Sequence, residues 1–121
     1  MWRASVSCMS RSFSLGRRLI AARRGTRVAV VPCDDFSARV TVLRNDSRQE
    51  FTGLAFHPSG RFLAATSNDN TVKLYDTSTW TMAHAFDWQI GRLRSIAFSF
   101  DGMLAAAGSD KGKVVVWDFD L

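Results

Sequence analysis

Short stretches of apolar residues alternate with turn residues throughout the second half of the chain. Gly60 and Gly102 each end a turn, and an alanine-rich apolar stretch follows each of them. Between residues 28 and 121 no segment keeps a period of 3.6 over eleven residues, as a helix would require. The pattern predicts an all-β fold. Two of the strands end at residues 56 and 98, and the others span 62–66, 71–75, 79–86, 103–108 and 113–117.

One segment of the sequence occurs twice, 42 residues apart. Residues 51–76 and 93–118 align without a gap, and eight of their 26 positions are identical. The same offset extends backwards, because Val72–Asp76 aligns with Val30–Asp34 and Ser78–Phe86 with Phe36–Arg44. A period of this size indicates an architecture of stacked repeats. We therefore expect two clear copies and a degenerate third copy before them.

The third strand of the second copy is apolar at every position from Val114 to Trp117. A strand that does not alternate between apolar and polar residues is typical of a sheet covered on both faces. Stacked sheets provide such an environment. We therefore expect Val114–Trp117 to be buried on both sides.

Each copy ends in an aromatic residue followed by aspartate, Tyr75-Asp76 in the first and Trp117-Asp118 in the second. Each also contains an aromatic-to-glycine turn, at Phe56–Gly60 and Phe98–Gly102. With the 42-residue period, these motifs resemble the WD-repeat family, and the alanine-rich strands resemble its bacterial members. The resemblance implies a partial WD-repeat β-propeller with two to three four-stranded antiparallel blades, whose ring is not closed within this chain. Tyr75 and Trp117 would fill the gaps between blades, and Asp76 and Asp118 would cap the turns that follow.

The sequence departs from the family pattern at two places. The Gly-His pair that often precedes the first strand is replaced by Phe86–Gln89, and Asp69 of the hairpin turn is matched by Lys111 in the second copy. The polar network that such residues form in the family is therefore expected to be incomplete. Apolar packing between the sheets must then hold the repeats together.

The resemblance divides the chain into four segments. Residues 1–27 are a basic segment that is a degenerate blade, a targeting sequence or a disordered tail, and the parallel between Phe13–Ala22 and Phe56–Ala65 favours the blade. Residues 28–50 are the second half of that blade, 51–92 a complete blade, and 93–121 a blade without its own fourth strand. We expect either a piece of a longer protein or a chain that self-associates to complete the propeller.

Charge is distributed unevenly. Residues 1–27 contain seven arginines and no acid, whereas the remaining residues have nine basic and eleven acidic side chains. Without a basic stripe on the body, nucleic acid is not an expected partner. We expect a cytoplasmic location. The alternative is a mitochondrial one, because an acid-free start rich in arginine and serine is typical of mitochondrial presequences.

Cys8 and Cys33 match neither a disulfide framework nor a metal motif. No apolar run in the sequence is long enough to cross a membrane.

No set of residues in the sequence indicates catalysis. His57 and His84 have no cysteine or second histidine at metal-ligand spacing, and we expect them to pack or to face solvent. Asp76 and Asp118 belong to different repeats, so they cannot act as a catalytic pair in one pocket. We therefore expect a protein that is not an enzyme and that binds no metal and no cofactor.

We expect a non-catalytic scaffold that binds a protein or peptide through the loops at one rim. Trp88, flanked by Asp87 and Arg92, is the candidate contact, because tryptophan and arginine are favoured at interface hot spots. The alternative for Trp88 is a position packed beneath its own loop. For the whole chain, the alternatives are a regulatory or sensing tail of a larger multidomain protein, enzymatic or not, and a truncated gene product without independent function.

Overall fold

The computed structural model describes residues 19–32 and 40–119. Within these ranges the chain forms strands and no helix, so none of the described elements is a helix that could cross a membrane. The strands are β1 (Leu19–Arg24), β2 (Arg27–Pro32), β3 (Thr41–Arg44), β4 (Phe51–Phe56), β5 (Phe62–Ser67), β6 (Thr71–Asp76), β7 (Met82–Asp87), β8 (Leu93–Phe98), β9 (Leu104–Ser109) and β10 (Val114–Asp118).

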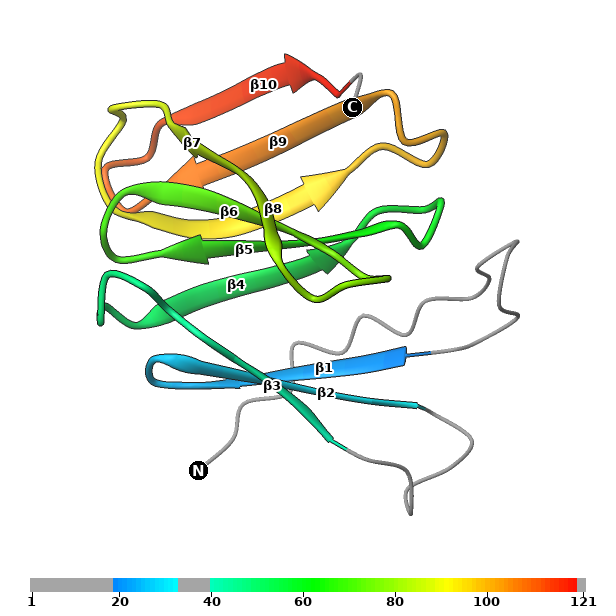
Figure 1. The fold of residues 1–121 in the computed structure, drawn as a ribbon. Coiled ribbons are helices and arrows are strands. Elements are labelled where there is room, and N and C mark those ends of the chain that lie inside the picture. Colours follow the sequence, from blue (N-terminus) through cyan, green and yellow to red (C-terminus); the bar gives the residue numbers. More distant parts are fainter. Residues whose placement is uncertain (1–18, 33–39, 120–121) are drawn as a thin grey trace.

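The strands form three antiparallel sheets that lie one above another (Figure 1). The middle sheet has four strands in the order β4-β5-β6-β7, and the outer sheets are β1-β2-β3 and β8-β9-β10. Within each sheet, strands that pair are consecutive in the sequence and antiparallel. The predicted all-β fold of stacked, unclosed blades is confirmed.

The middle sheet is covered on both faces, and strand β5 shows this most clearly. Leu63 and Ala65 pack against the sheet β1–β3, whereas Phe62 and Ala64 pack against the sheet β8–β10. Every residue of β5 is buried. Since successive side chains of a strand point to opposite faces, the apolar residues Phe62–Ala65 contribute to two separate cores.

The two copies also share a bulge in their first strand. The pairing shifts between Phe51 and Gly53 in β4 and between Leu93 and Ser95 in β8, which are equivalent positions. A Cβ atom on Gly53 would lie 2.8 Å from Thr66 Oγ1 and 3.0 Å from the Arg94 carbonyl oxygen. Glycine at this position therefore allows β4 and β8 to approach each other closely.

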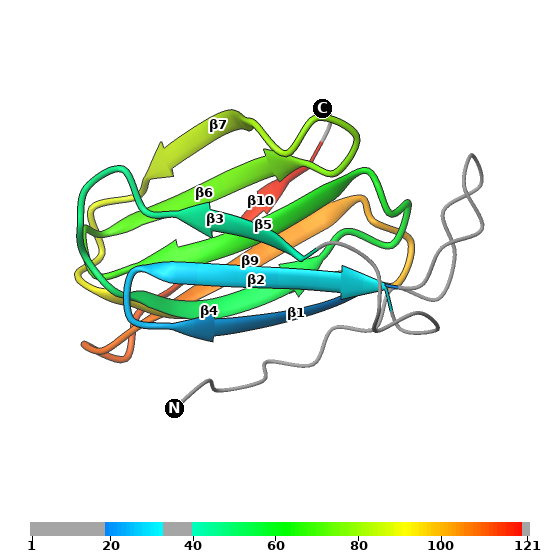
Figure 2. The same ribbon diagram turned by 60° about the horizontal axis from the view of Figure 1, so that its bottom comes forward.

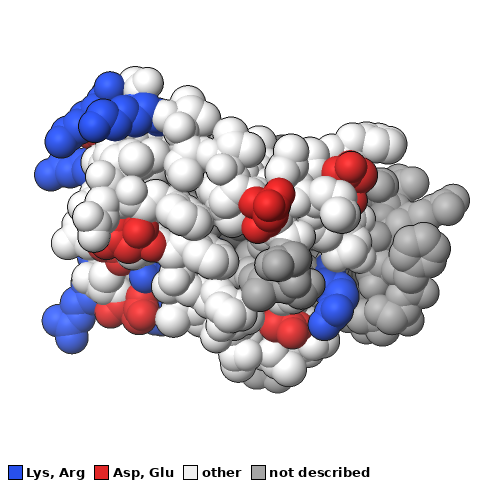
Figure 3. Space-filling model, turned by 90° about the horizontal axis from the view of Figure 1, so that it is seen from above, with Lys and Arg blue, Asp and Glu red and all other residues white. Residues whose placement is uncertain are grey.

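The expectation that Val114–Trp117 is buried on both sides is wrong. Only Val115 and Trp117 pack toward the middle sheet, while 69% of Val114 and 59% of Val116 is exposed. No sheet within the described residues covers the outer face of β8–β10. Seen from above, Lys and Arg side chains gather mainly on the left of this face, and acidic side chains are scattered among uncharged residues (Figure 3).

The expected alignment of the degenerate copy is also wrong by one or two residues. Val28 pairs with Leu43 as Val72 pairs with Phe86, so Val72 is equivalent to Val28 and not to Val30. Val28 and Val30 both point into the core, and a shift of two residues keeps every side chain on its face. The apolar pattern alone therefore could not distinguish the two alignments.

Several sequence-based expectations lie outside the described residues. They concern Cys8, Cys33 and the part of the basic segment before Leu19. The end of that segment is described: Leu19–Arg24 is strand β1, which pairs with β2.

The two-sided core predicts a large effect of truncation at Leu63, which is fully buried. Leu63→Ala should lower the free energy of unfolding by about 2–5 kcal/mol, because it removes apolar contacts and leaves a cavity. Met82→Ala, at a residue that is 44% exposed, should change it by less than about 0.5 kcal/mol. Chemical denaturation of both variants measures the difference, and equal losses would contradict the two-sided core.

Candidate functional site

Five loops and turns lie at the same end of the stacked sheets, on the left in Figure 1, and we call this end the rim. Backbone hydrogen bonds connect neighbouring rim segments. The amide of Phe51 donates to the Gly25 carbonyl at 2.8 Å, and the amides of Asn68 and Asp110 donate to the carbonyls of Glu50 and Arg92, both at 2.9 Å. The rim segments are 25–26, 45–50, 68–70, 88–92 and 110–112. These bonds join the first three rim segments into one group and the last two into another.

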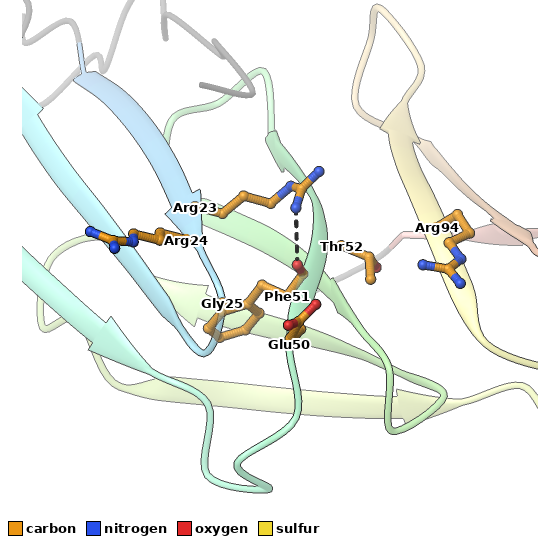
Figure 4. A pocket seen from close by; sticks show the side chains of 7 residues that line it. All are labelled: Arg23, Arg24, Gly25, Glu50, Phe51, Thr52 and Arg94. Carbon is orange, nitrogen blue, oxygen red and sulfur yellow. Dashed lines mark hydrogen bonds between the residues drawn. The ribbon is translucent and has the colours of Figure 1, made fainter. Parts of the chain in front are cut away.

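A polar hollow of about 480 Å³ opens on the rim between the three sheets. Three arginines and one acid line it, and Figure 4 shows their arrangement. Its residues are Arg23, Arg24, Gly25, Glu50, Phe51, Thr52 and Arg94. We call it the arginine hollow.

Arg23 is held in place by the middle sheet. Leu19, Ala21 and Arg23 alternate along β1, so the side chain of Arg23 points toward β4 as the two apolar ones do. Its Nη1 donates a hydrogen bond to the Phe51 carbonyl at 3.2 Å. Its Nε is buried and has no hydrogen-bond partner in the part of the chain that the structure describes. Arg23 therefore presents a fixed cation with unused donor capacity.

Arg94 comes from the first strand of the other outer sheet and extends toward Thr52 in Figure 4. Its side chain is 51% exposed, and its Nη2 lies 4.0 Å from a carboxylate oxygen of Asp110, at the outer limit of an ion pair. Thr52 is tied between the sheets, because its hydroxyl donates to the Leu93 carbonyl at 2.6 Å. Arg94 is thus a weakly paired cation close to Thr52, whose side chain is fixed by its hydrogen bond to the neighbouring sheet.

The arginine hollow suits recognition of an oxyanion. Guanidinium groups form forked hydrogen bonds with carboxylate or phosphate oxygens. Besides the arginines, the polar side chains of the lining are Glu50 and Thr52. No group of three His, Cys, Asp or Glu side chains in residues 19–32 and 40–119 could hold a metal ion.

A charged network joins the β3–β4 loop to the β5–β6 hairpin. Nζ of Lys73, whose side chain is only 5% exposed, lies 2.8 Å from Asp46 and 3.1 Å from Asp69. Burial opposes the ionisation of Asp69, but hydrogen bonds from Thr71, Lys73 and neighbouring serines hold its pKa well below the usual range. Burial, and then the charges of Asp46 and Asp69, raise the pKa of Tyr75 to about 12.

The residues predicted from the repeats are spread over the sheets. Tyr75 is buried between the lower and middle sheets, and Trp117 packs between the middle and upper sheets. Asp76 accepts hydrogen bonds from the amide and the hydroxyl of Ser78, at 2.8 and 2.6 Å. Asp118 is exposed at the end of β10. Gly60 takes a positive φ of 79° in its turn.

His57 connects two repeats. Its Nε2 donates to the Gly102 carbonyl at 2.9 Å, and its Nδ1 accepts a hydrogen bond from the Ser59 amide at 3.1 Å. Its ring stacks on Phe119 at 4.7 Å between centroids. A Cβ atom on Gly102, whose φ is +76°, would lie 2.7 Å from the His57 ring. His57 therefore packs across the boundary between sheets.

Trp88, the predicted contact residue, is half-buried. Its ring lies 4.9 Å from that of Trp117 and is stacked on Phe86 at 5.8 Å. The buried Nε1 atoms of Trp88 and Trp117 find no hydrogen-bond partner within the described residues. Asp87 and Arg92 flank Trp88 in exposed positions and do not line the arginine hollow.

Sequence reasoning missed the arginine hollow. Arg23 and Arg24 belong to the basic segment 1–27, which differs in charge from the rest of the chain, and Arg94 lies 70 residues after Arg24. Only the stacking of three sheets brings them together. The available signal was the proposed correspondence of Phe13–Ala22 with Phe56–Ala65, which extends into β1 and places Arg23 beside the body.

The network around Asp69 predicts a stability that depends on pH. Because the folded-state pKa lies below the ordinary value of 3.8, the ionised form stabilises the fold above that pH, and this contribution is lost as pH falls below it. At neutral pH, Asp69→Asn should cost about 1–2 kcal/mol, and the cost should shrink in strongly acidic solution. Urea melts against pH measure both effects. The exposed control Asp118→Asn should show neither, and a cost of Asp69→Asn that persists in acid would contradict the assignment.

Comparison with known proteins supports the repeat architecture. The family model described as "WD domain, G-beta repeat" matches residues 37–76 and 80–118, more than half of the chain. The chain is 39% identical over 67 residues to the target of rapamycin complex subunit wat1 of Schizosaccharomyces pombe, covering 54% of this chain and 21% of that protein.

Two further relatives are similar over comparable stretches. Pre-mRNA-processing factor 19 of Oryza sativa is 30% identical over 80 residues, covering 65% of this chain and 15% of that protein. A guanine nucleotide-binding protein subunit beta of Oryza sativa is 30% identical over 76 residues, covering 57% and 20%. The chain thus spans about a fifth or less of the length of these relatives. With two matched repeats in the register of its sheets, the chain belongs to the WD-repeat family.

Proposed function

We propose that the chain is a non-catalytic interaction scaffold that binds an acidic segment of a partner protein in the arginine hollow. Family membership supports the general role. Two relatives are named for association with other proteins, as a subunit of the target of rapamycin complex and as a receptor-associated protein. The observation that carries the specific proposal is the convergence of Arg23 and Arg94 from two outer sheets on one rim hollow.

The two arginines have complementary properties for binding a carboxylate. Arg23 is fixed by its bond to the Phe51 carbonyl, so little side-chain freedom is lost when a ligand binds. Arg94 is half-exposed and only weakly paired, so its guanidinium is available for a forked hydrogen bond. Glu50 offsets part of the positive charge, but the three arginines of the lining leave an excess of positive charge that favours an anionic ligand.

The shape of the site favours a peptide over a nucleic acid. A nucleic acid binds along a row of cations, often with exposed aromatic rings between them. Here Arg23 and Arg94 lie at one hollow, and the only aromatic residue in its lining, Phe51, is 1% exposed. A single acidic side chain of an extended peptide fits this arrangement.

Binding is measured with a short fluorescent peptide rich in glutamate and with the same peptide carrying glutamine at every glutamate. The glutamate peptide should bind more tightly, and Arg94→Gln should weaken its binding roughly tenfold, the effect of losing one charge-assisted hydrogen-bond pair. Higher salt should weaken binding as well.

Arg61→Gln is the matched control, because Arg61 is an exposed arginine in the β4–β5 turn at the opposite end of the sheets. It should leave the affinity unchanged. Equal losses in the two variants, or tighter binding of a single-stranded oligonucleotide at the same salt concentration, would contradict the proposal.

A further inference from the structure

Three arginines lie side by side on the outer face of the sheet β1–β3, the face turned forward in Figure 2. Arg24 pairs with Arg27 across the first hairpin, and Arg27 pairs with Arg44 on the other side. Directly paired residues of antiparallel strands project from the same face. We call this set the arginine row.

The strand pattern assigns the arginine row to the outer face. Val28 and Leu43 point into the core, so their neighbours Arg27 and Arg44 project to the other side. Arg24, Arg27 and Arg44 are all exposed. None of the three makes an ion pair with another described residue. A second shallow hollow of about 460 Å³ lies at the hairpin end of the row, lined by Arg24, Gly25, Thr26 and Arg27.

The repeat architecture does not require this charge. The residues at the equivalent places in the middle sheet are Ser67, Thr71 and Asp87, and the pair Thr71–Asp87 corresponds to Arg27–Arg44. Like charges directly opposite each other lower the stability of a sheet. An anion placed between these arginines would remove that repulsion, so the row in the free protein is poised for an anionic ligand.

Beside the arginine row, the same face carries a row of small apolar residues. Ala22 pairs with Ala29, and Ala29 pairs with Val42, which is 47% exposed. The face therefore presents a line of cations next to a shallow apolar strip. A ligand that matches it has a compact group with more than one negative charge and an apolar residue close by.

We propose that the arginine row binds a phosphorylated side chain, phosphoserine or phosphothreonine, of a peptide whose neighbouring apolar residue lies on the Ala22–Ala29–Val42 strip. A phosphate carries nearly two negative charges and three strong acceptor oxygens, so it can receive hydrogen bonds from two or three guanidinium groups at once. One carboxylate neutralises only one of the three cations. The inference deepens the proposed scaffold function and rests on it, since the row lies next to the arginine hollow and shares Arg24 with it.

The test compares one acidic peptide in three forms: with serine, with phosphoserine and with aspartate at a position next to a leucine. The phosphoserine form should bind the full chain roughly tenfold more tightly than the serine form, with the aspartate form between them. Arg27→Gln should abolish most of that gain. Arg48→Gln is the matched control, because Arg48 is an exposed rim arginine outside the row, and it should retain the gain.

A second measurement separates ligand binding from a structural role. Without ligand, Arg27→Gln should raise the melting temperature, because it relieves repulsion with Arg24 and Arg44. Inorganic phosphate should raise the melting temperature of the native chain more than chloride does at equal ionic strength, and Arg27→Gln should lose this difference. A variant that melts at a lower temperature and binds less would indicate a structural residue and overturn the proposal.

The outcomes for the two proposals are distinct. If the phosphoserine and serine forms bind equally and Arg94→Gln still weakens both, the phosphate site is wrong and the acidic-peptide scaffold stands. If free phosphate stabilises the chain through Arg27 but no peptide form binds, the scaffold is wrong and the row is an anion site without a peptide. The proposal for the arginine row is overturned if the phosphoserine peptide still binds more tightly than the serine peptide to Arg27→Gln, or if Arg48→Gln also removes that difference.

Discussion

The structure depends on apolar strands that must be covered on both faces. The middle sheet meets this requirement, because Leu63 and Ala65 pack on one neighbour while Phe62 and Ala64 pack on the other. A single sheet of this composition would expose at least one of the two sets to water. The free-energy cost is roughly 25 cal/mol for each Å² of apolar surface exposed. Stacking is therefore the condition under which the repeat folds, and the spacing of the rim loops follows from it.

This dependence explains why the polar contacts between sheets are few and local. Lys73 reaches Asp46 of the neighbouring sheet's loop, His57 reaches the Gly102 carbonyl, and Thr52 reaches the Leu93 carbonyl. Each lies at an end or an inner edge of a sheet. The indole nitrogens of Trp88 and Trp117, by contrast, are buried without a partner among the described residues. Packing fixes the distance between sheets, and the polar contacts fix how their ends align.

The repeat in the sequence predicted the fold because each copy contains the same apolar and turn positions. It could not predict which sheet lacks a covering neighbour, so the same kind of apolar run is buried in β5 but half-exposed in β10. It could not align the degenerate copy, because a shift of two residues preserves the faces of Val28 and Val30. The repeat also could not predict the arginine hollow, because Arg23 and Arg94 come together only through the stacking of the sheets.

The unequal covering of the three sheets has a consequence for how the molecule opens. Sheets that contact only their neighbours behave as a one-dimensional array, in which each unit is stabilised by the interfaces it makes. The middle sheet makes two such interfaces and each outer sheet makes one within the described residues. Backbone amides of β9 and β10 should therefore exchange their hydrogens with solvent sooner than those of β5. Fraying from the ends would expose the sheet β1–β3 and its arginines to transient rearrangement while the central strands stay closed.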